Sequence, residues 1–244
     1  MAKIKCVASG SSGNCYILEA DGEILILDAG ILRKDLLGAL GYSINGLVGC
    51  LISHGHLDHL KSAKDLAILS VPVFAPFIDY SKAIMKKQYG GFDITAFALT
   101  DIYGNWCHTN GDGTDCPNYG FRIKHKDLGT LLYVTDTKLI KYRFKDLDHV
   151  LIGINYQDEY ISDDGFKYGH VKRGHLELKT ACEFLRVCES NRPLQTVLCG
   201  HLSDSSADPN EVVTAVMKVA RNALVCVAAP SLEVELRNPS ICPF

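Results

Sequence analysis

Short apolar runs recur along the sequence, and most of them end at a polar residue or a glycine. Runs of this length predict β-strands, whereas longer stretches with apolar positions three and four residues apart predict helices. We expect strands at residues 3–7, 16–20, 23–27, 47–52, 71–75, 92–99, 119–123, 131–135, 150–154 and 196–200, with a final strand at 225–229. We expect helices at residues 31–40, 62–69, 79–88, 176–188 and 210–221.

The order of these elements predicts an α/β fold that forms one domain, residues 1–244. Asp21-Gly22 lies between two short strands and is a hairpin signal, so we expect the first three strands to form a meander. Strands and helices alternate after it, which fits two packed sheets with helices outside. We find no repeat, linker or low-complexity run that divides the chain.

Polar side chains end several of the predicted strands. His54, Asp136, Asn155 and His201 each stand where an apolar run stops. Any one of them alone can be an ordinary turn residue. Because strand ends meet at one edge of a sheet, where α/β folds place their sites, we expect the four to converge there.

The segment that follows residues 47–52 is rich in histidine. It reads Ser53-His54-Gly55-His56-Leu57-Asp58-His59. In extended backbone the first two histidines, two residues apart, point the same way. Asp58 and His59 follow where a helix begins, so they can serve a neighbouring point. Imidazole and carboxylate groups together suit zinc, manganese or iron, although a polar surface loop is the alternative.

The motif His-x-His-x-Asp-His after an apolar strand resembles the signature of the metallo-β-lactamase superfamily. The loop Ser9-Gly10-Ser11-Ser12-Gly13-Asn14, followed by a strand that ends in Asp28-Ala29-Gly30, is similar to the YycJ/WalJ branch, which is associated with nuclease activity. This resemblance, which covers residues 3 to about 229, implies a four-layer αββα sandwich, with two mixed β-sheets flanked by helices.

The resemblance also implies a site for two divalent metal ions, zinc or manganese. Seven ligands are expected: His54, His56 and a third histidine for the first ion, Asp58, His59 and His201 for the second, and Asp136 as the bridge.

The third histidine of the first ion departs from the family pattern. Relatives carry a His-Asp pair shortly before a strand like Tyr119-Gly120-Phe121, and an ungapped alignment places Thr114-Asp115 there. We expect His108 to replace it from a longer loop, with Asp112 and Asp115 as the alternatives.

Two metal ions lower the pKa of a shared water and stabilise an anionic oxygen, which suits phosphodiester hydrolysis. We expect Asp58 to orient the water and His175, within a Gly-His-Leu motif that resembles one of the branch, to protonate the leaving group. The residues expected to contact substrate are Ser9, Ser11, Ser12, Asn14, Asn155 and His175.

Composition and charge leave three functions open. The formal charge is −3, so DNA binding needs a local basic patch. Lys82, Lys86 and Lys87 are either a solvated helix face or such a patch, and Lys124, Lys126 and the pair Lys172-Arg173 are further candidates. The first function is a DNA exonuclease. The second is a small-molecule or cyclic-nucleotide phosphodiesterase. The third is a non-catalytic binding protein, supported by Thr114 and by Gly153, where relatives carry an acidic residue.

The cell compartment and the remaining side chains follow from composition. Ten cysteines without a Cys-x-x-Cys pair, and a start that does not read as a signal peptide, predict a cytoplasmic protein with mostly buried thiols. No apolar run reaches the ~18 residues of a membrane span. His125 and His149 stand among charged residues and are expected at the surface. The oligomeric state, homodimer included, stays open.

Overall fold

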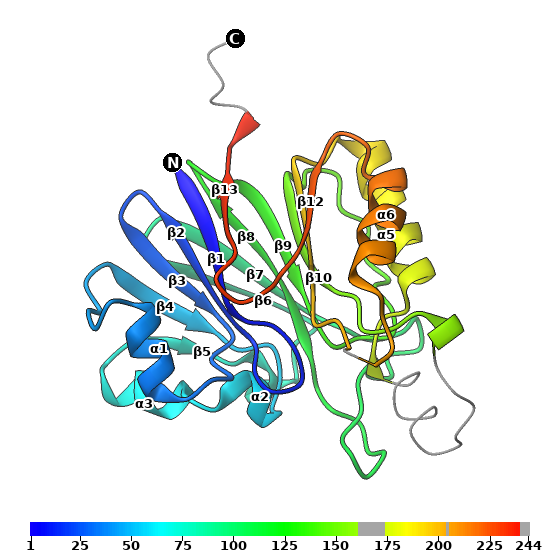
Figure 1. The fold of residues 1–244 in the computed structure, drawn as a ribbon. Helices are drawn as coiled ribbons and strands as arrows, with labels where there is room; N and C mark the ends of the chain where they lie inside the picture. The colour runs from blue at the N-terminus through cyan, green and yellow to red at the C-terminus, as the bar shows by residue number, and fades with distance from the viewer. Residues whose placement is uncertain (161–173, 204, 240–244) are drawn as a thin grey trace.

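The computed structural model of the protein describes residues 1–160, 174–203 and 205–239, and it shows two β-sheets packed face to face (Figure 1). Of the described strands, those of the first sheet lie in the order β13 (Glu233–Leu236), β1 (Ala2–Ala8), β2 (Cys15–Ala20), β3 (Glu23–Leu27), β4 (Leu47–Leu51) and β5 (Val73–Phe74). Those of the second sheet lie in the order β12 (Leu224–Val227), β11 (Thr196–Gly200), β10 (His149–Gly153), β9 (Gly129–Val134), β8 (Tyr119–His125), β7 (Phe92–Ala98) and β6 (Ile84–Tyr89).

Helices cover both outer faces of this sandwich (Figure 1). The first sheet carries α1 (Arg33–Ala39), α2 (Leu57–Leu60) and α3 (Ala63–Ile68), and the second carries α5 (Leu178–Asn191) and α6 (Pro209–Val219). Two 3-10 helices, η1 (Pro76–Asp79) and η2 (Asp158–Tyr160), lie in the connections. The predicted fold class, two mixed sheets flanked by helices, is therefore confirmed.

Three apolar layers hold the sandwich together. Leu27, Phe121 and Tyr133 are fully buried between the two sheets. Ile152 packs outward beneath α5 and α6 in a second layer, and Leu36 of α1 belongs to a third layer outside the first sheet. Each such side chain contributes about 1.5–3 kcal/mol of burial free energy, so the sheets form a stable base for the loops above them.

The strand directions bring several strand ends to one edge. β1, β2 and β3 form the predicted antiparallel meander, with a two-residue turn at Asp21 (φ 52°) and Gly22 (φ 77°). β3 pairs in parallel with β4, and β9, β10, β11 and β12 are parallel to one another. Parallel strands end at the same edge of their sheet, so the residues that follow them gather there.

The helix expected at residues 79–88 is wrong. Residues 84–89 form β6, which pairs antiparallel with β7 from Ile84 opposite Phe97 to Tyr89 opposite Phe92. Ala, Met, Lys and Gln favour helices in isolation, but tertiary pairing overrides this propensity. Gly90 and Gly91 form the two-residue turn between the strands, a hairpin signal that the helix prediction overlooked.

Two further expectations need correction. The strand 224–227 is not the last one, because β13 follows it and pairs antiparallel with β1. His125 and His149 are buried rather than at the surface. His125 accepts a hydrogen bond from the backbone N–H of Asp127, and the Nε2 atom of His149 lies 3.1 Å from the carbonyl oxygen of Leu128. Both histidines therefore pack into the sandwich, whatever the charge of their sequence neighbours.

The cysteines of the described residues are all free thiols, and all but Cys226 are buried, as predicted. Within the same residues, we find no helix long and apolar enough to cross a membrane. Lys172 and Arg173, two of the candidate basic residues, lie outside the described residues.

Candidate metal centre

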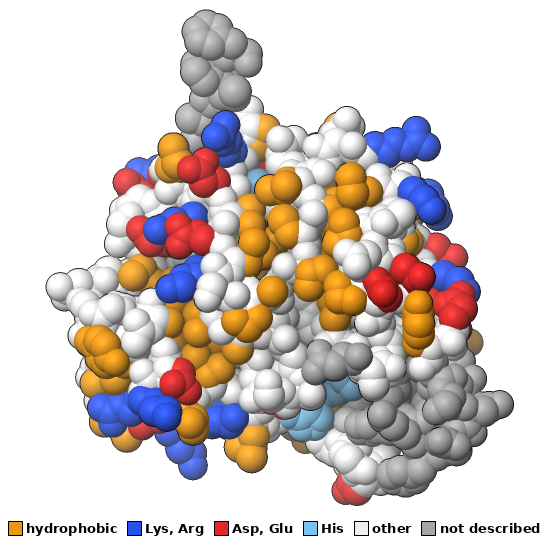
Figure 2. Space-filling model, viewed as in Figure 1, with side chains coloured by type: hydrophobic (Ala, Val, Ile, Leu, Met, Phe, Trp, Pro, Cys, Tyr) orange, Lys and Arg blue, Asp and Glu red, His pale blue; other side chains and the backbone are white. Residues whose placement is uncertain are grey.

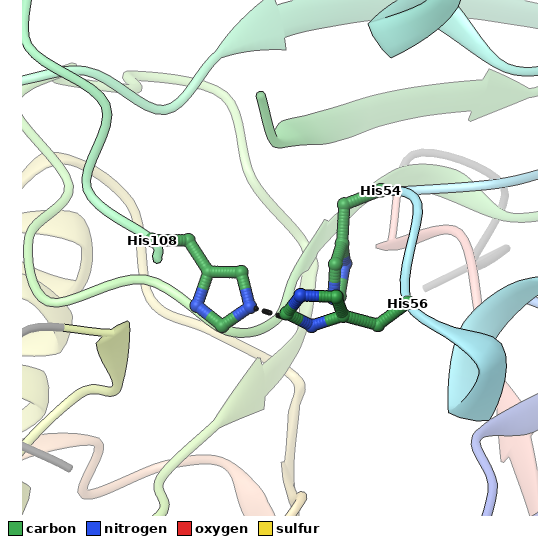
Figure 3. Close-up of side chains that lie close together, drawn as sticks. All are labelled: His54, His56 and His108. Carbon is green, nitrogen blue, oxygen red and sulfur yellow. Dashed lines mark hydrogen bonds between the residues drawn. The ribbon is translucent and has the colours of Figure 1, made fainter. Parts of the chain in front are cut away.

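Three histidines from two distant segments meet beside the end of β4. His54 and His56 belong to the loop that follows β4, and His108 comes from the long loop between β7 and β8 (Figure 3). One ring nitrogen from each lies within 4.8 Å of the others, and His108 Nε2 is 3.1 Å from His56 Nδ1. The three rings therefore point at one small volume, in the arrangement expected of metal ligands.

A second group of four ligand atoms lies next to the first. It contains Asp58, His59, Asp136 and His201, again with all ligand atoms within 4.8 Å of one another. His59 Nε2 lies 3.3 Å from Asp58 Oδ2, and His201 Nε2 lies 3.8 Å from the same oxygen. The short helix α2, which follows β4, supplies Asp58 and His59, and the loops after β9 and β11 supply the other two, so the parallel strand ends create the group.

Asp136 lies between the two groups. Its Oδ2 atom is 3.0 Å from His59 Nε2 and 3.6 Å from His54 Nε2, and its Oδ1 atom is 3.3 Å from His201 Nε2. One buried carboxylate thus contacts ligand nitrogens of both groups. This is the position that a bridging ligand of two metal ions needs.

The histidine nitrogens that face away from the two groups have partners of their own. His59 Nδ1–H donates to Asp28 Oδ2 at 2.7 Å, and His108 Nδ1–H donates to the Gly174 carbonyl oxygen at 2.8 Å. The other contacts are His54 Nδ1 with Ser53 Oγ, His56 Nε2 with Asn110 Oδ1, and His201 Nδ1 with the Asn155 amide. Contacts in which the ring N–H donates orient a metal-binding ring and raise its basicity, whereas the Asn155 amide is a donor and only orients the His201 ring.

The inward-facing nitrogens fit a metal ion. Among the described residues, His54 Nε2 and His201 Nε2 are buried side-chain atoms without a hydrogen-bond partner. Buried polar atoms normally have one, so an ion at this point explains both. Imidazole and carboxylate donors are the ligands of zinc, manganese and iron.

Burial sets the charge of the first group. It holds the pKa of His54 well below its usual value and lowers the pKa of His108 to about 3, so both rings are neutral at pH 7 and keep a lone pair for a metal ion. Burial opposes the charge of Asp136, yet the His201 and His59 rings hold the pKa of this carboxyl well below its usual value.

The second group carries a proton that a metal ion would displace. Burial works against the charged form of His59, but the carboxylates of Asp28 and Asp136 raise the pKa of this ring well above its usual value. His59 is therefore protonated at neutral pH in the metal-free protein. Metal binding releases such protons, so the affinity for metal rises with pH.

The two groups open into a cleft of about 620 Å³. Of the residues expected to contact substrate, those that line it are Ser9, Ser11, Ser12, Asn155 and His175. Ser9 Oγ also accepts hydrogen bonds from the His201 backbone N–H and from the Tyr16 hydroxyl, so it supports the loop after β11. Asn14 lies beneath the rim, buried, with its Nδ2 atom 3.0 Å from the Gly10 carbonyl oxygen and 3.1 Å from His59 Nε2.

The three candidates for the third ligand of the first ion all lie in the loop between β7 and β8, but they differ in position. Asp112 and Asp115 are exposed, and Asp112 accepts hydrogen bonds from the N–H and the hydroxyl of Thr114. The Nδ2 atom of Asn110 donates to Thr114 Oγ1, so Thr114 holds the residue that contacts His56. His108 alone of the three candidates lies in the ligand group.

Asp28 supports the metal ligands, a role that the sequence analysis did not predict. It is fully buried after β3 and accepts hydrogen bonds from the Ser53 N–H, the Ser53 hydroxyl, His59 and the Tyr133 hydroxyl. The signal was present, because Asp28 also ends an apolar run. Gly30, two residues later, is required for packing, since a Cβ atom there would lie 1.6 Å from the Asp58 carbonyl oxygen.

Fold and site together resemble those of the metallo-beta-lactamase superfamily. Residues 8–97, which include the His54–His59 loop, match the family model described as Metallo-beta-lactamase superfamily. The crystal structure of the metallo-beta-lactamase fold protein YhfI from Bacillus subtilis superposes with a TM-score of 0.68, at 16% identity over 96% of this chain and 98% of that one.

Curated relatives show a narrower similarity. The chain is 27% identical to the exodeoxyribonuclease WalJ of Streptococcus pneumoniae over 220 residues, which cover 82% of this chain and 81% of that protein. It is also 27% identical to the exodeoxyribonuclease YycJ of Bacillus anthracis over 152 residues, 57% of this chain and 56% of the relative. The resemblance to this branch that the motifs predicted is thereby confirmed.

Proposed function

We propose that the protein is a DNA exonuclease that hydrolyses phosphodiester bonds with two divalent metal ions, zinc or manganese. The position of Asp136, in contact with ligand nitrogens of both groups, is the observation that supports it best. His54, His56 and His108 would hold one ion, and Asp58, His59 and His201 the other. When bound, the ions supply an activated water and stabilise negative charge on phosphate oxygens.

The chain's own residues would carry the remaining steps. His175 lines the cleft, and its Nδ1 atom is 3.5 Å from Asp136 Oδ1. Imidazole is the side chain most often used for proton transfer at neutral pH, so His175 is proposed to protonate the leaving oxygen. Asp58, at the floor of the same cleft, is proposed to orient the water. The rim hydroxyls of Ser11 and Ser12 would donate hydrogen bonds to a phosphate.

The curated relatives support DNA as the substrate, because both are named exodeoxyribonucleases. A second candidate, a small-molecule phosphodiesterase, is favoured by one observation. Among the described residues, the lining of the cleft contains no lysine or arginine, whereas nucleic-acid sites normally lean on basic side chains. The free thiols support the prediction of a cytoplasmic protein.

Metal content and turnover of the same samples test the proposal. We expect about two metal ions per wild-type chain, a loss of metal in His108→Ala and in Asp136→Ala, and hydrolysis of bis(p-nitrophenyl) phosphate and of a single-stranded oligonucleotide by the wild type. The exposed Asp115→Ala is the matched control and should keep both metal and activity.

Each contrary outcome has a definite meaning. Hydrolysis of the small substrate without hydrolysis of DNA selects the small-molecule phosphodiesterase. Bound metal without any turnover selects a binding protein. A His108→Ala variant with the metal content of the wild type contradicts the assignment of His108.

A further inference from the structure

An apolar groove of about 930 Å³ runs beside the metal centre, on the open side of the sandwich where both sheets end. It lies between α3, β5, η1 and β6. Its floor is formed by the side chains of Phe74, Phe77, Met85 and Tyr89. Phe74 is buried, whereas Phe77, Met85 and Tyr89 are only half-buried, so flat aromatic and apolar surface faces the solvent.

Lysines surround this groove and its approach to the cleft. They are exposed, and no ion pair to any of them is found among the described residues: Lys61, Lys64, Lys82, Lys86 and Lys87. At the opposite end of the sandwich, by contrast, Lys124 lies 2.9 Å from Asp146. The acidic residues near the groove do not balance this charge, since Asp65 pairs with Arg33 and Asp79 brings one negative charge against five lysines.

The groove lies close to the metal centre. Gly55 stands between the ligands His54 and His56, and a Cβ atom built on it would lie 3.5 Å from the Phe77 ring. The Nζ atom of Lys61 is 3.4 Å from the carbonyl oxygen of Ser12, a residue of the cleft rim. Figure 2 shows Lys and Arg side chains gathered at the lower left, over α1 and α3, and histidine side chains at the lower centre.

We propose that this lysine-rimmed groove binds the single-stranded part of the DNA whose end lies in the metal centre. The inference rests on the proposed nuclease function, and it supplies the basic surface that the described lining of the cleft lacks. Phosphates would pair with the lysines, and bases would stack on the aromatic floor, as in sequence-independent binding of single strands. A second copy of the chain fits less well, because antiparallel pairing of the full length of β6 with itself would set Lys86 against Lys87.

Two triple variants with the same change of charge test this inference. Lys82→Gln/Lys86→Gln/Lys87→Gln removes three charges from the groove. The control, Lys145→Gln/Lys218→Gln/Arg221→Gln, removes three exposed charges elsewhere. Anisotropy of a fluorescent 20-residue oligothymidine, in EDTA and from 50 to 200 mM NaCl, measures binding without cleavage. Turnover of bis(p-nitrophenyl) phosphate with Mn²⁺ reports on the metal centre alone.

Each phosphate contact contributes about 0.7 to the slope of log affinity against log salt for a single strand. The groove variant should therefore lose about 2 from this slope and bind about 100-fold more weakly at 0.1 M NaCl, if affinity at 1 M salt is unchanged. Its turnover of the small substrate should stay within about twofold of wild type, as should that of the control.

The contrary outcomes separate the two proposals. If the wild type cleaves the oligonucleotide and the groove variant binds and cleaves it like the control, the groove inference is wrong and the nuclease function stands. The groove would then be open to an acidic protein segment. If the wild type hydrolyses only the small substrate and does not bind the oligonucleotide, the nuclease function fails, and the groove inference fails with it.

Discussion

Asp28→Asn tests whether the second layer of the site holds the metal ligands in place. Asp28 has no exposed surface, and its Oδ2 atom accepts hydrogen bonds from the Ser53 hydroxyl at 2.9 Å, from His59 Nδ1 at 2.7 Å and from the Tyr133 hydroxyl. Its Oδ1 atom accepts a fourth bond, from the Ser53 N–H at 2.8 Å. An asparagine here has one oxygen, so its NH₂ group must face at least one of these donors.

The expected magnitude follows from these contacts. A buried donor left without an acceptor costs about 1–3 kcal/mol, so the free energy of unfolding of the metal-free variant should fall by about 2 kcal/mol. Loss of an outer partner of a metal-binding histidine typically lowers metal affinity about 10- to 100-fold. We expect Asp28→Asn to lose metal affinity in that range, although Asp28 is not itself in either ligand group.

Chelator competition measures the metal affinity, and urea unfolding of the metal-free protein measures the stability. Asp115→Asn is the matched control, because Asp115 is an exposed carboxylate in the loop that carries His108. It should leave both quantities unchanged. Wild-type metal affinity in Asp28→Asn would refute the reasoning, since it would show that His59 needs no carboxylate behind it.

Three other substitutions have definite expected outcomes. Gly30→Ala places a Cβ atom 1.6 Å from the Asp58 carbonyl oxygen, so urea unfolding should show a loss of about 3 kcal/mol or more. Asn110→Ala removes the acceptor of His56 Nε2–H, and chelator competition should show metal affinity about tenfold lower. Burial lowers the pKa of His149 from 6.5 to about 4. Between these two pH values, His149 is protonated in the unfolded chain but neutral in the folded chain. The metal-free wild type should therefore lose about 3 kcal/mol between pH 7 and pH 4 through this residue, and His149→Gln should not show this part of the loss.

Much of the site was predictable because strand ends leave a simple trace in the sequence. His54, Asp136, Asn155 and His201 each end an apolar run; the last three line one cleft, and His54 lies beside it in the first ligand group. The parallel pairing of β9, β10 and β11 explains the success, because it carries the last three of these side chains to the same edge. The local pattern of a polar residue at the end of an apolar run therefore predicted that distant segments lie close together.

Other features depend on partners that the sequence pattern does not reveal. β6 has the composition of a helix and becomes a strand only because β7 lies beside it. His125 and His149 have charged sequence neighbours but pack against the Phe92 ring and the Leu128 carbonyl oxygen. The sequence also left Asp112 and Asp115 as alternatives to His108, because it does not show which residue of the loop reaches the other ligands. The position that relatives give to histidine holds Thr114, and only the folded loop shows that Thr114 supports Asn110 instead.

Three residues of the site have a backbone conformation that costs conformational free energy. Asp28, Asp136 and His201 all have positive φ, at 55°, 45° and 53°. Left-handed backbone costs a non-glycine residue about 1–2 kcal/mol, so three such residues in one site need compensation. The hydrogen bonds to Asp28 and the contacts of Asp136 with His59 and His201 supply part of it. A bound metal ion would supply more. Glycine at any of the three positions would relieve the strain and remove the functional side chain, so chemistry rather than folding accounts for an aspartate or histidine there.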